Sequence, residues 1–362
     1  MVEVTTSLII NDVTMQGSGV YSAHSDLQHE AMLQALPLIE KAAKAMETHI
    51  AGQVLTVAEY GAAQGANSIE PLEKITKSIP PENLQILFND KANNDFNTLS
   101  STITEWRKRF TKPSFIGMIL GSFYDQILPA SSVDLGFSLS SVQHLSTTQP
   151  MMDENLQRIP NADRLLQEQA HKDLLRFLCQ RAIETKPGGS LVLSFPSKSN
   201  SGQSDLVGPT TSIFGALKIM FAEGKVSKKV LSSLNEPLYN RSMEDVQSTL
   251  SQVNELWNMR ECFESRVIHP AYLELQKAKS DRGLISDEAA WKYTHAIIDW
   301  VMAVVAGYLL KALMDGDPEN YSEEKGSEIV AEWIKKIKEF YFDHFKGEEV
   351  SMSFIHVWLQ RK

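Results

Sequence analysis

A glycine-containing turn near residue 60 is the first place where the residue types indicate ligand binding. The apolar run Val54–Tyr60 carries Glu59 and is followed by Gly61, Gly65 and Asn67, in the pattern E-x-G-x-x-x-G. Glycines let a ligand approach the backbone closely, and a carboxylate at the end of a strand can accept its hydrogen bonds. The pattern is neither G-x-G-x-x-G nor a GK[ST] phosphate loop, so neither of those turns is supported. An ordinary turn after a strand is the alternative interpretation.

Two further groups of polar residues follow later apolar runs. Asp90 comes after Asn89, and its two carboxylate oxygens can accept hydrogen bonds from both hydroxyls of a ribose. The alternative interpretation is an aspartate that caps a helix or a turn. In the segment GSFY, the Ser122 hydroxyl can bond to adenine and the Phe123 ring can cover the face of the base. The alternative is a loop whose two aromatic residues pack into the core.

The elements that must position these turns alternate between strand and helix. Apolar runs predict strands at residues 54–60, 84–89, 114–120, 133–140 and 190–195. Apolar residues that recur near the 3.6-residue period predict helices at 26–49, 93–109 and 162–185. This alternation predicts an α/β fold with a Rossmann-like, doubly wound, mostly parallel sheet, in which the carboxyl ends of the strands meet at one edge.

The chain after Pro196 is mainly helical. A polar loop at 197–212 precedes predicted helices at 213–223, 242–260, 285–315 and 322–343. Two segments, 264–275 and 350–359, are predicted to return to the sheet as strands. We therefore expect a cofactor-binding core with an N-terminal active-site segment at 1–200, a helical substrate cap at 201–345 and a last core strand within 346–362.

Composition excludes several classes of partner. The 362 residues are 43% hydrophobic and 22% charged, with a net charge of −10, which is typical of a globular protein and argues against nucleic acid or an anionic membrane as partner. Two cysteines cannot build a disulfide framework, and the histidine spacings fit no metal site, so we expect no metal ion.

The N-terminus lacks a signal-peptide pattern, and the most apolar stretch, 296–313, is shorter than a membrane span. A cytoplasmic protein is the expectation.

Four motifs, in this order, resemble those of the SABATH methyltransferases, the family of plant salicylate, benzoate and jasmonate carboxyl methyltransferases. The turn pattern E-x-G-x-x-x-G itself resembles the first motif of S-adenosylmethionine-dependent methyltransferases. Residues 15–28 are similar to the family's M-x-G-G followed by Y-A-x-N-S-x-x-Q. The other three resemble N-D-L-x-x-N-D-F-N at 89–97, G-S-F-Y-x-x-L-F-P-x-x-S at 121–132 and N-x-P-x-Y-x-P-S-x-x-E-V at 235–246. The resemblance extends from about Met15 to the C-terminus.

The resemblance implies a class I methyltransferase fold, a homodimer, and S-adenosylmethionine as cofactor, with S-adenosylhomocysteine as its product. Gln28 matches the glutamine that binds the substrate carboxylate, and His144 stands where the family has a tryptophan that makes the second carboxylate contact. Gln143, at a methionine position, would also contact the substrate, as would Phe214 and Trp300 from the cap, together with Ile213, Met220, Met302 and Val305. The residues implied around the cofactor are Tyr21, Ser25, Glu59, Gly61, Asn67, Asp90, Lys91, Ser122 and Phe123.

Several of these positions depart from the family pattern. Glu59 replaces the usual aspartate and Lys91 replaces a leucine. Ser140, Gln143 and His144 make the pocket more polar than that of the plant salicylate enzymes, and a histidine can titrate near neutral pH. We therefore expect a divergent, non-plant-type member of the family.

The resemblance implies conversion of a small carboxylic acid to its methyl ester, with aromatic, cinnamate-like and short dicarboxylic acids as candidates. A carboxylate is ionised at neutral pH, so in-line methyl transfer needs no general base, only placement and exclusion of water. Gln28 and His144 are predicted to hold one carboxylate oxygen and to direct the other at the methyl group of the cofactor. Two alternatives stay open: methyl transfer to the nitrogen of a small heterocycle, and a non-catalytic relative that only binds the cofactor.

Overall fold

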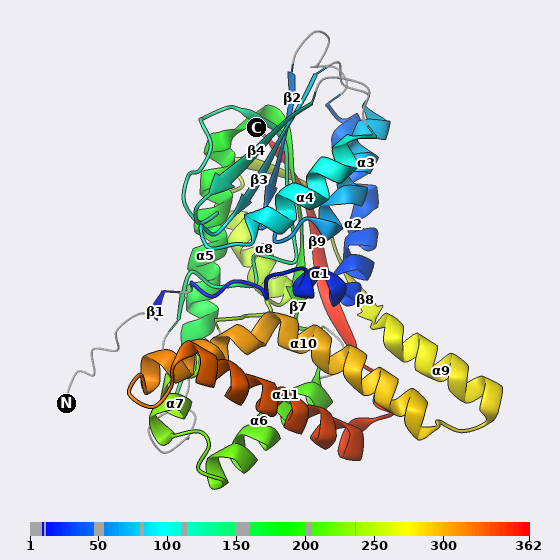
Figure 1. The fold of residues 1–362 in the computed structure, drawn as a ribbon. Helices are drawn as coiled ribbons and strands as arrows, with labels where there is room; N and C mark the ends of the chain where they lie inside the picture. The colour runs from blue at the N-terminus through cyan, green and yellow to red at the C-terminus, as the bar shows by residue number, and fades with distance from the viewer. Residues whose placement is uncertain are drawn as a thin grey trace.

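The central element of the computed structural model is a seven-stranded, mostly parallel β-sheet (Figure 1). The structure describes residues 9–10, 12–46, 54–79, 83–109, 114–148, 160–199, 205–235 and 237–362. The sheet strands are β2 (Val54–Tyr60), β3 (Asn83–Asp90), β4 (Ser114–Leu120), β5 (Val133–Leu139), β7 (Thr185–Ser197), β8 (Trp257–Ile268) and β9 (Ser351–Arg361). Their order is β4-β3-β2-β5-β7-β9-β8, and only β9 runs opposite to the other six strands. The predicted Rossmann-like α/β fold is confirmed.

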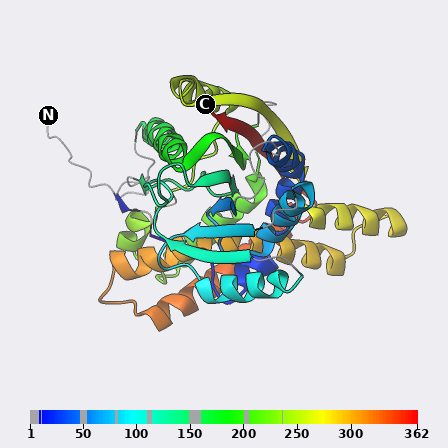
Figure 2. The same cartoon turned by 90° about the horizontal axis from the view of Figure 1, so that it is seen from above.

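Helices cover both faces of this sheet (Figure 2). Leu55 and Val57 of β2 point into one apolar core and Ala58 and Tyr60 into the other, so the strand is apolar on both sides, as a buried parallel strand must be. The first core is closed by α2 (Asp26–Lys44), α3 (Ile69–Ser78) and α4 (Phe96–Arg107), and the second by α5 (Ala162–Glu184) and α8 (Met243–Gln252).

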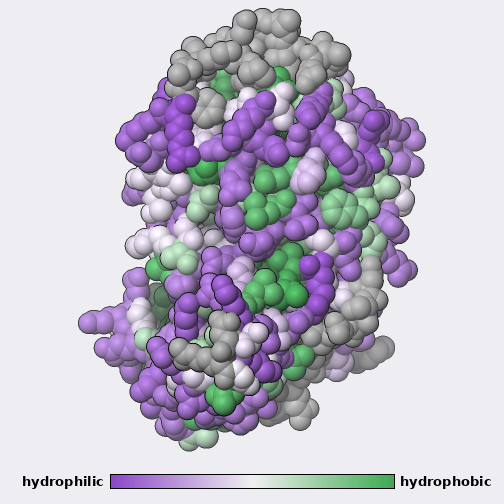
Figure 3. All heavy atoms as spheres, turned by 90° about the vertical axis from the view of Figure 1, so that its right-hand side faces the viewer, coloured by the Kyte–Doolittle hydropathy of each residue, from purple (hydrophilic) through white to green (hydrophobic). Residues whose placement is uncertain are grey.

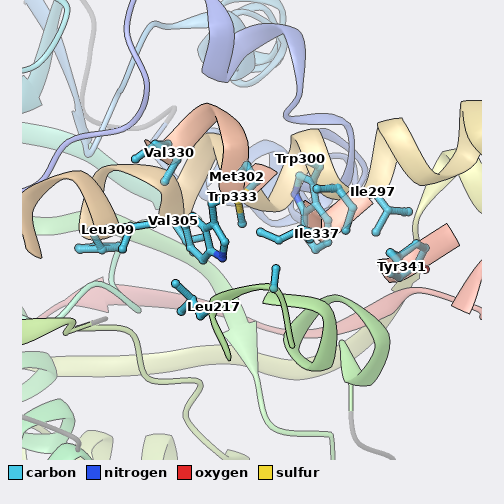
Figure 4. Packing of buried hydrophobic residues seen from close by; sticks show 14 of the residues in the cluster. Leu217, Ile297, Trp300, Met302, Val305, Leu309, Val330, Trp333, Ile337 and Tyr341 are labelled. Atoms are coloured by element: carbon cyan, nitrogen blue, oxygen red, sulfur yellow. The ribbon is translucent and has the colours of Figure 1, made fainter. Parts of the chain in front are cut away.

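A separate group of helices forms a cap at one end of the sheet (Figure 1). Its members are α6 (Val207–Ala222), α7 (Lys228–Ser233), α9 (Pro270–Arg282), α10 (Asp287–Gly316) and α11 (Glu323–Phe345). Leu217 from α6, Met302 from α10 and Trp333 from α11 belong to the apolar cluster that holds the cap together (Figure 4). On the face drawn in Figure 3, hydrophilic side chains cover most of the surface and hydrophobic ones form separate groups.

Helix α10 is longer than the apolar stretch 296–313 suggested. Over 30 residues it meets the length and hydropathy of a membrane span, so the expectation that this segment is too short for one was wrong. The structure buries 61% of its most apolar window inside the protein, as in the core helix of a folded domain.

Register brings the predicted turns to one edge of the sheet. Tyr60 pairs with Asn89, Asp90 pairs with Leu120, and Glu59 pairs with Phe137 on the other side of β2. The carboxyl ends of these parallel strands therefore meet, on the side that faces the cap. Short elements complete this region: β1 (Ile9–Ile10) pairs with β6 (Thr147–Thr148), and α1 (Val20–Ala23) and a 3-10 turn (Ala66–Ser68) precede α2 and α3.

Several element boundaries differ from the prediction. Helix α6 begins at Val207, inside the polar loop predicted at 197–212, and β7 begins at Thr185, before the predicted strand 190–195. The predicted helix 242–260 ends at Gln252, and β8 begins at Trp257, while the predicted strand 264–275 ends at Ile268, because Pro270 opens α9. Pairing along the whole of β9 decides the strand, whose own side chains are mostly half-exposed and show no apolar run. The domain boundaries proposed from the sequence stay a prediction, and residues 47–49 of the first predicted helix lie outside the described part of the chain.

Candidate active site

Gly61 turns the chain away from β2 in a conformation that only glycine adopts easily. Its φ is +85°, and a Cβ added there would lie 2.3 Å from Ser141 Oγ. The Gly61 N–H donates to the Asn89 carbonyl at 2.9 Å, and Ser141 Oγ donates to the Gly61 carbonyl at 3.1 Å. The turn is therefore held by the neighbouring strand ends, and its glycine is required by backbone conformation and by contact.

Asp90 closes the same turn from the end of β3. Its Oδ2 accepts from the Ala63 N–H at 2.7 Å and its Oδ1 from the Lys91 N–H at 2.8 Å. A carboxylate has about four acceptor positions, so two remain for a ligand. Asn94 Nδ2 donates to the Ala63 carbonyl at 2.7 Å, which fixes the turn further. The N-D-x-x-x-N spacing thus builds one hydrogen-bonded corner.

The N-terminal segment is tied over this corner. Asp95 caps α4 by accepting from the Thr98 N–H at 3.0 Å, and its second oxygen accepts from the Ser18 N–H at 2.8 Å. Lys91 Nζ donates to the Val13 carbonyl at 2.6 Å. Because of these contacts, the motif around residue 95 holds the segment that carries the first predicted site residues.

The turns and the N-terminal segment enclose a space of about 170 Å³, here called the cofactor cavity. All nine predicted cofactor residues line it, together with both predicted carboxylate donors. They are Tyr21, Ser25, Glu59, Gly61, Asn67, Asp90, Lys91, Ser122 and Phe123, with Gln28 and His144. Among the described residues, no cluster of three or more His, Cys, Asp or Glu side chains is arranged to hold a metal ion.

Burial dominates the electrostatics of this cavity. It raises the pKa of Glu59 to about 8, with a further contribution from the Asp90 carboxylate, and Glu59 Oε2 has no hydrogen-bond partner among the described residues. Burial also raises the pKa of Asp90 and lowers that of Lys91 to about 8. A buried carboxyl group with an unpartnered oxygen is costly in its ionised form unless a donor or a cation stabilises it. The cavity therefore suits a ligand that brings a positive charge.

A second, larger space of about 600 Å³ lies between the sheet and the cap, here called the substrate cavity. Gln28 and Ser140 line both cavities, so they mark the junction. The predicted residues Gln143, Phe214 and Trp300 line the substrate cavity, as do Ile213 and Val305. Met220 and Met302 do not line it, because both are buried in the cap core.

Two side chains at the junction have defined partners. Gln28 Oε1 accepts from Trp300 Nε1 at 2.8 Å, and Gln143 Nε2 donates to the Ser140 carbonyl at 2.7 Å, which leaves Gln143 Oε1 buried without a partner in the described chain. His144 Nδ1 lies 3.4 Å from the Tyr308 hydroxyl.

His144 is not a group that titrates near neutral pH, contrary to the expectation from its residue type. Burial, with a smaller contribution from Lys91, lowers its pKa to about 3. The imidazole is therefore neutral throughout the physiological range. It keeps one ring N–H donor without adding a charge.

Comparison with known proteins agrees with this geometry. A family model described as "SAM dependent carboxyl methyltransferase" matches residues 11–342. The chain belongs to this family. It is 43% identical to "Methyltransferase LUC1" of Fusarium sp over 97% of this chain and 98% of that one. It is 41% identical to "Methyltransferase FUS9" of Gibberella fujikuroi, with the same coverage.

A solved structure titled "Loganic acid methyltransferase with SAH" shares the fold. Its TM-score is 0.71 at 18% identity, and the match covers 96% of this chain and 99% of that chain. As a member of the family, this carboxyl methyltransferase uses S-adenosylmethionine. The cavity residues fit that cofactor, because Glu59 and Asp90 place two carboxyl groups along the lining of the cavity, and Asp90 has free acceptor positions.

The raised pKa of Glu59 predicts that cofactor binding depends on pH. Below about pH 8 the free enzyme holds Glu59 protonated, and only the carboxylate pairs with a cation. The dissociation constant of S-adenosylmethionine should therefore fall about tenfold or more as the pH rises from about 6 to about 9. Calorimetry at several pH values measures it.

Glu59→Gln is the control for this prediction, because the amide keeps the shape and does not titrate. Deprotonation of Lys91 would act in the same direction, and it persists in this variant. A pH dependence of equal size in the wild type and in Glu59→Gln would contradict the assignment to Glu59.

Two residues of the site were not predicted from the sequence. Gln64 is buried and ties the turn after β2 to the N-terminal segment: its Nε2 donates to the Gln16 carbonyl at 2.7 Å, and its Oε1 accepts from the Ser22 N–H at 3.2 Å. It stands inside the E-x-G-x-x-x-G pattern at a position to which the pattern gives no identity. Tyr308 was not predicted either, because the sequence around it in the cap does not indicate a contact with His144.

Proposed function

We propose that this carboxyl methyltransferase forms the methyl ester of an organic acid with an extended apolar body. The volume of the substrate cavity carries this proposal. Its 600 Å³ corresponds to roughly twenty water molecules of liquid and lies well inside the range of cavities that enclose drug-sized ligands. The aromatic, cinnamate-like and short dicarboxylic acids expected from the sequence would leave much of it unfilled.

The lining of the cavity supports an apolar body for the acid. The cap contributes mostly aliphatic and aromatic side chains, among them Ile213, Phe214, Val304 and Val305. Burial of apolar surface stabilises by about 25 cal/mol per Å², so a long apolar acid gains more here than a short one. Gln143 Oε1, buried without a partner in the described chain, would accept a hydrogen bond from a hydroxyl group on such an acid.

The carboxylate of the acid would lie at the junction of the two cavities. Gln28 Nε2 and the neutral ring of His144 are the proposed donors to one of its oxygens. Neutral donors suit this task, because a strong ion pair would hold the electron density that the carboxylate must give to the methyl carbon. The other oxygen would then face the cofactor cavity.

In this mechanism the chain binds, orients and excludes water. S-adenosylmethionine supplies an electrophilic methyl group, and the ionised acid needs no general base. The N-terminal segment and α10 cover the junction, so the reacting groups meet away from bulk water, where placement alone can contribute several orders of magnitude in rate. No protein residue has to give or take a proton in this reaction.

Transfer to nitrogen in a small heterocycle is the second candidate. Gln28 argues against it, because its amide matches the carboxylate-binding glutamine of the family. A homodimer and a cytoplasmic location are also proposed, both from the sequence and its family resemblance alone.

A panel of acids tests the size of the substrate. Purified protein would be given methyl-labelled S-adenosylmethionine with benzoate, cinnamate, glutarate, decanoate or hexadecanoate. We expect kcat/KM to rise from the short acids to the long ones, because more apolar surface enters the cavity. A preference for benzoate or glutarate over both long acids would refute the extended apolar body and leave carboxyl methylation intact.

A further inference from the structure

One face of the cap helix α10 contacts both Gln28 and His144, the two proposed donors to the substrate carboxylate, here called the carboxylate grip. Trp300 Nε1 donates to Gln28 Oε1 at 2.8 Å, and the Tyr308 hydroxyl lies 3.4 Å from His144 Nδ1. Trp300 and Tyr308 are about two turns apart, at positions that share one stripe of a helix. The helix that lines the substrate cavity therefore also reaches the residues that would hold the carboxylate.

Trp300 determines which end of the Gln28 amide faces the substrate. An indole N–H only donates, so the atom that faces it must be the amide oxygen. The amide NH₂ then points elsewhere, and no described residue accepts a hydrogen bond from it. In the flipped orientation two donors would face each other, and the carbonyl oxygen would be presented to the carboxylate.

Trp300 is itself held firmly. It is 5% exposed, and the ring of His269 lies against it with centroids 5.2 Å apart at 60° (Figure 4 shows Trp300 among the inward residues of α10). Gly307, on the same helix, has no Cβ, and an added one would lie 2.8 Å from Val13 Cγ1. Helix α10 therefore packs closely on the N-terminal segment that leads into α2, the helix that carries Gln28.

We propose that Trp300 is a positioning residue for methyl transfer: it orients the Gln28 amide so that the NH₂ group donates to the substrate carboxylate, and Tyr308 supports His144 in the same way. The inference rests on the proposed function, because it assumes that Gln28 holds the carboxylate. It also gives the cap a second task. The same helix lines the substrate cavity, so recognition of the acid's body and orientation of the donors to its carboxylate depend on one element.

A double-mutant cycle tests the inference. The variants are Trp300→Phe, Gln28→Ala and the two together, assayed with the panel acid that gives the highest turnover. Trp300→Phe keeps an aromatic ring and removes the N–H donor. We expect it to lower kcat/KM about tenfold in the wild-type background and less than twofold in Gln28→Ala, because the amide that it orients is then absent. The dissociation constant of S-adenosylhomocysteine should stay within twofold throughout.

Trp291→Phe is the matched control. Trp291 lies on the same helix and stacks on Phe342 with centroids 4.2 Å apart, and it lines neither cavity. Its variant should retain full kcat/KM. An independent readout needs no acid at all: in ¹⁵N-tryptophan-labelled protein, the indole resonance that disappears in Trp300→Phe should shift in Gln28→Ala.

The outcomes separate the two proposals. Equal losses from Trp300→Phe in both backgrounds, or an indole resonance that Gln28→Ala leaves unmoved, would overturn the positioning role. Unchanged kcat/KM in Gln28→Ala alone would instead remove Gln28 from the carboxylate grip, and the proposed function would lose its central contact.

Discussion

Gln28→Glu should reduce kcat/KM for the acid by about 10³-fold or more. The glutamate carboxylate keeps the size of the amide and still accepts a hydrogen bond from Trp300 Nε1. It has no N–H to donate to the substrate, and it carries the same negative charge as the substrate carboxylate. Like charges brought together in a protein site cost several kcal/mol, and 1.4 kcal/mol is tenfold. Gln28→Ala, which removes the donor without adding a charge, should lose about 10²-fold.

The pH profile of Gln28→Glu identifies the cause. A protonated glutamic acid can donate its O–H, so the variant should recover activity as the pH falls toward about 5, whereas Gln28→Ala should not. Steady-state kinetics with labelled cofactor measures both, and calorimetry with S-adenosylhomocysteine should give an affinity within twofold of the wild type. Full activity in either variant would exclude Gln28 from the reaction.

Asp90→Asn should weaken the binding of S-adenosylmethionine and S-adenosylhomocysteine by about 10²-fold each. Hydrogen bonds to a charged group contribute about 1.5–3 kcal/mol, and the variant loses the charge while one buried N–H, of Ala63 or Lys91, meets an amide NH₂ instead of an oxygen. The two ligands should suffer equally, because the proposed contact is to the ribose that they share. At saturating cofactor, kcat should change little.

Asp125→Asn is the control for this prediction. Asp125 comes shortly after β4, the strand next to the one that ends at Asp90. It is exposed, pairs with Arg176 and does not line the cofactor cavity. Calorimetry on both variants, with thermal unfolding to verify that they fold, separates a local effect from a general one. Equal affinities for Asp90→Asn and the wild type would show that Asp90 does not contact the cofactor.

The residues predicted around the cofactor line one cavity in the structure, and the sequence could place them there because they belong to short motifs. Gly61 and Asp90 each follow a strand end, and the parallel register that joins Tyr60 to Asn89 brings them together without any longer-range information. Most strands were also predicted within a residue or two, since buried parallel strands are apolar on both faces.

The substrate side could not be predicted in the same way. Gln28 and Trp300 are 272 positions apart, and their hydrogen bond depends on the packing of the cap on the N-terminal segment. The neutral state of His144 depends on burial, which a residue type does not reveal. Strand β8 was misread because pairing with β9, and not its own pattern, makes it a strand.

The most direct test of the central claim is the chemistry of the product. Protein incubated with methyl-labelled S-adenosylmethionine would be given the panel acids, their matched amides and N-heterocycles, and the labelled product would then be treated with mild base. Carboxyl methylation predicts label with the acids only, and its release as methanol, because methyl esters hydrolyse in base. Base-stable label on a heterocycle, with none on any acid, would contradict the proposed methyl ester.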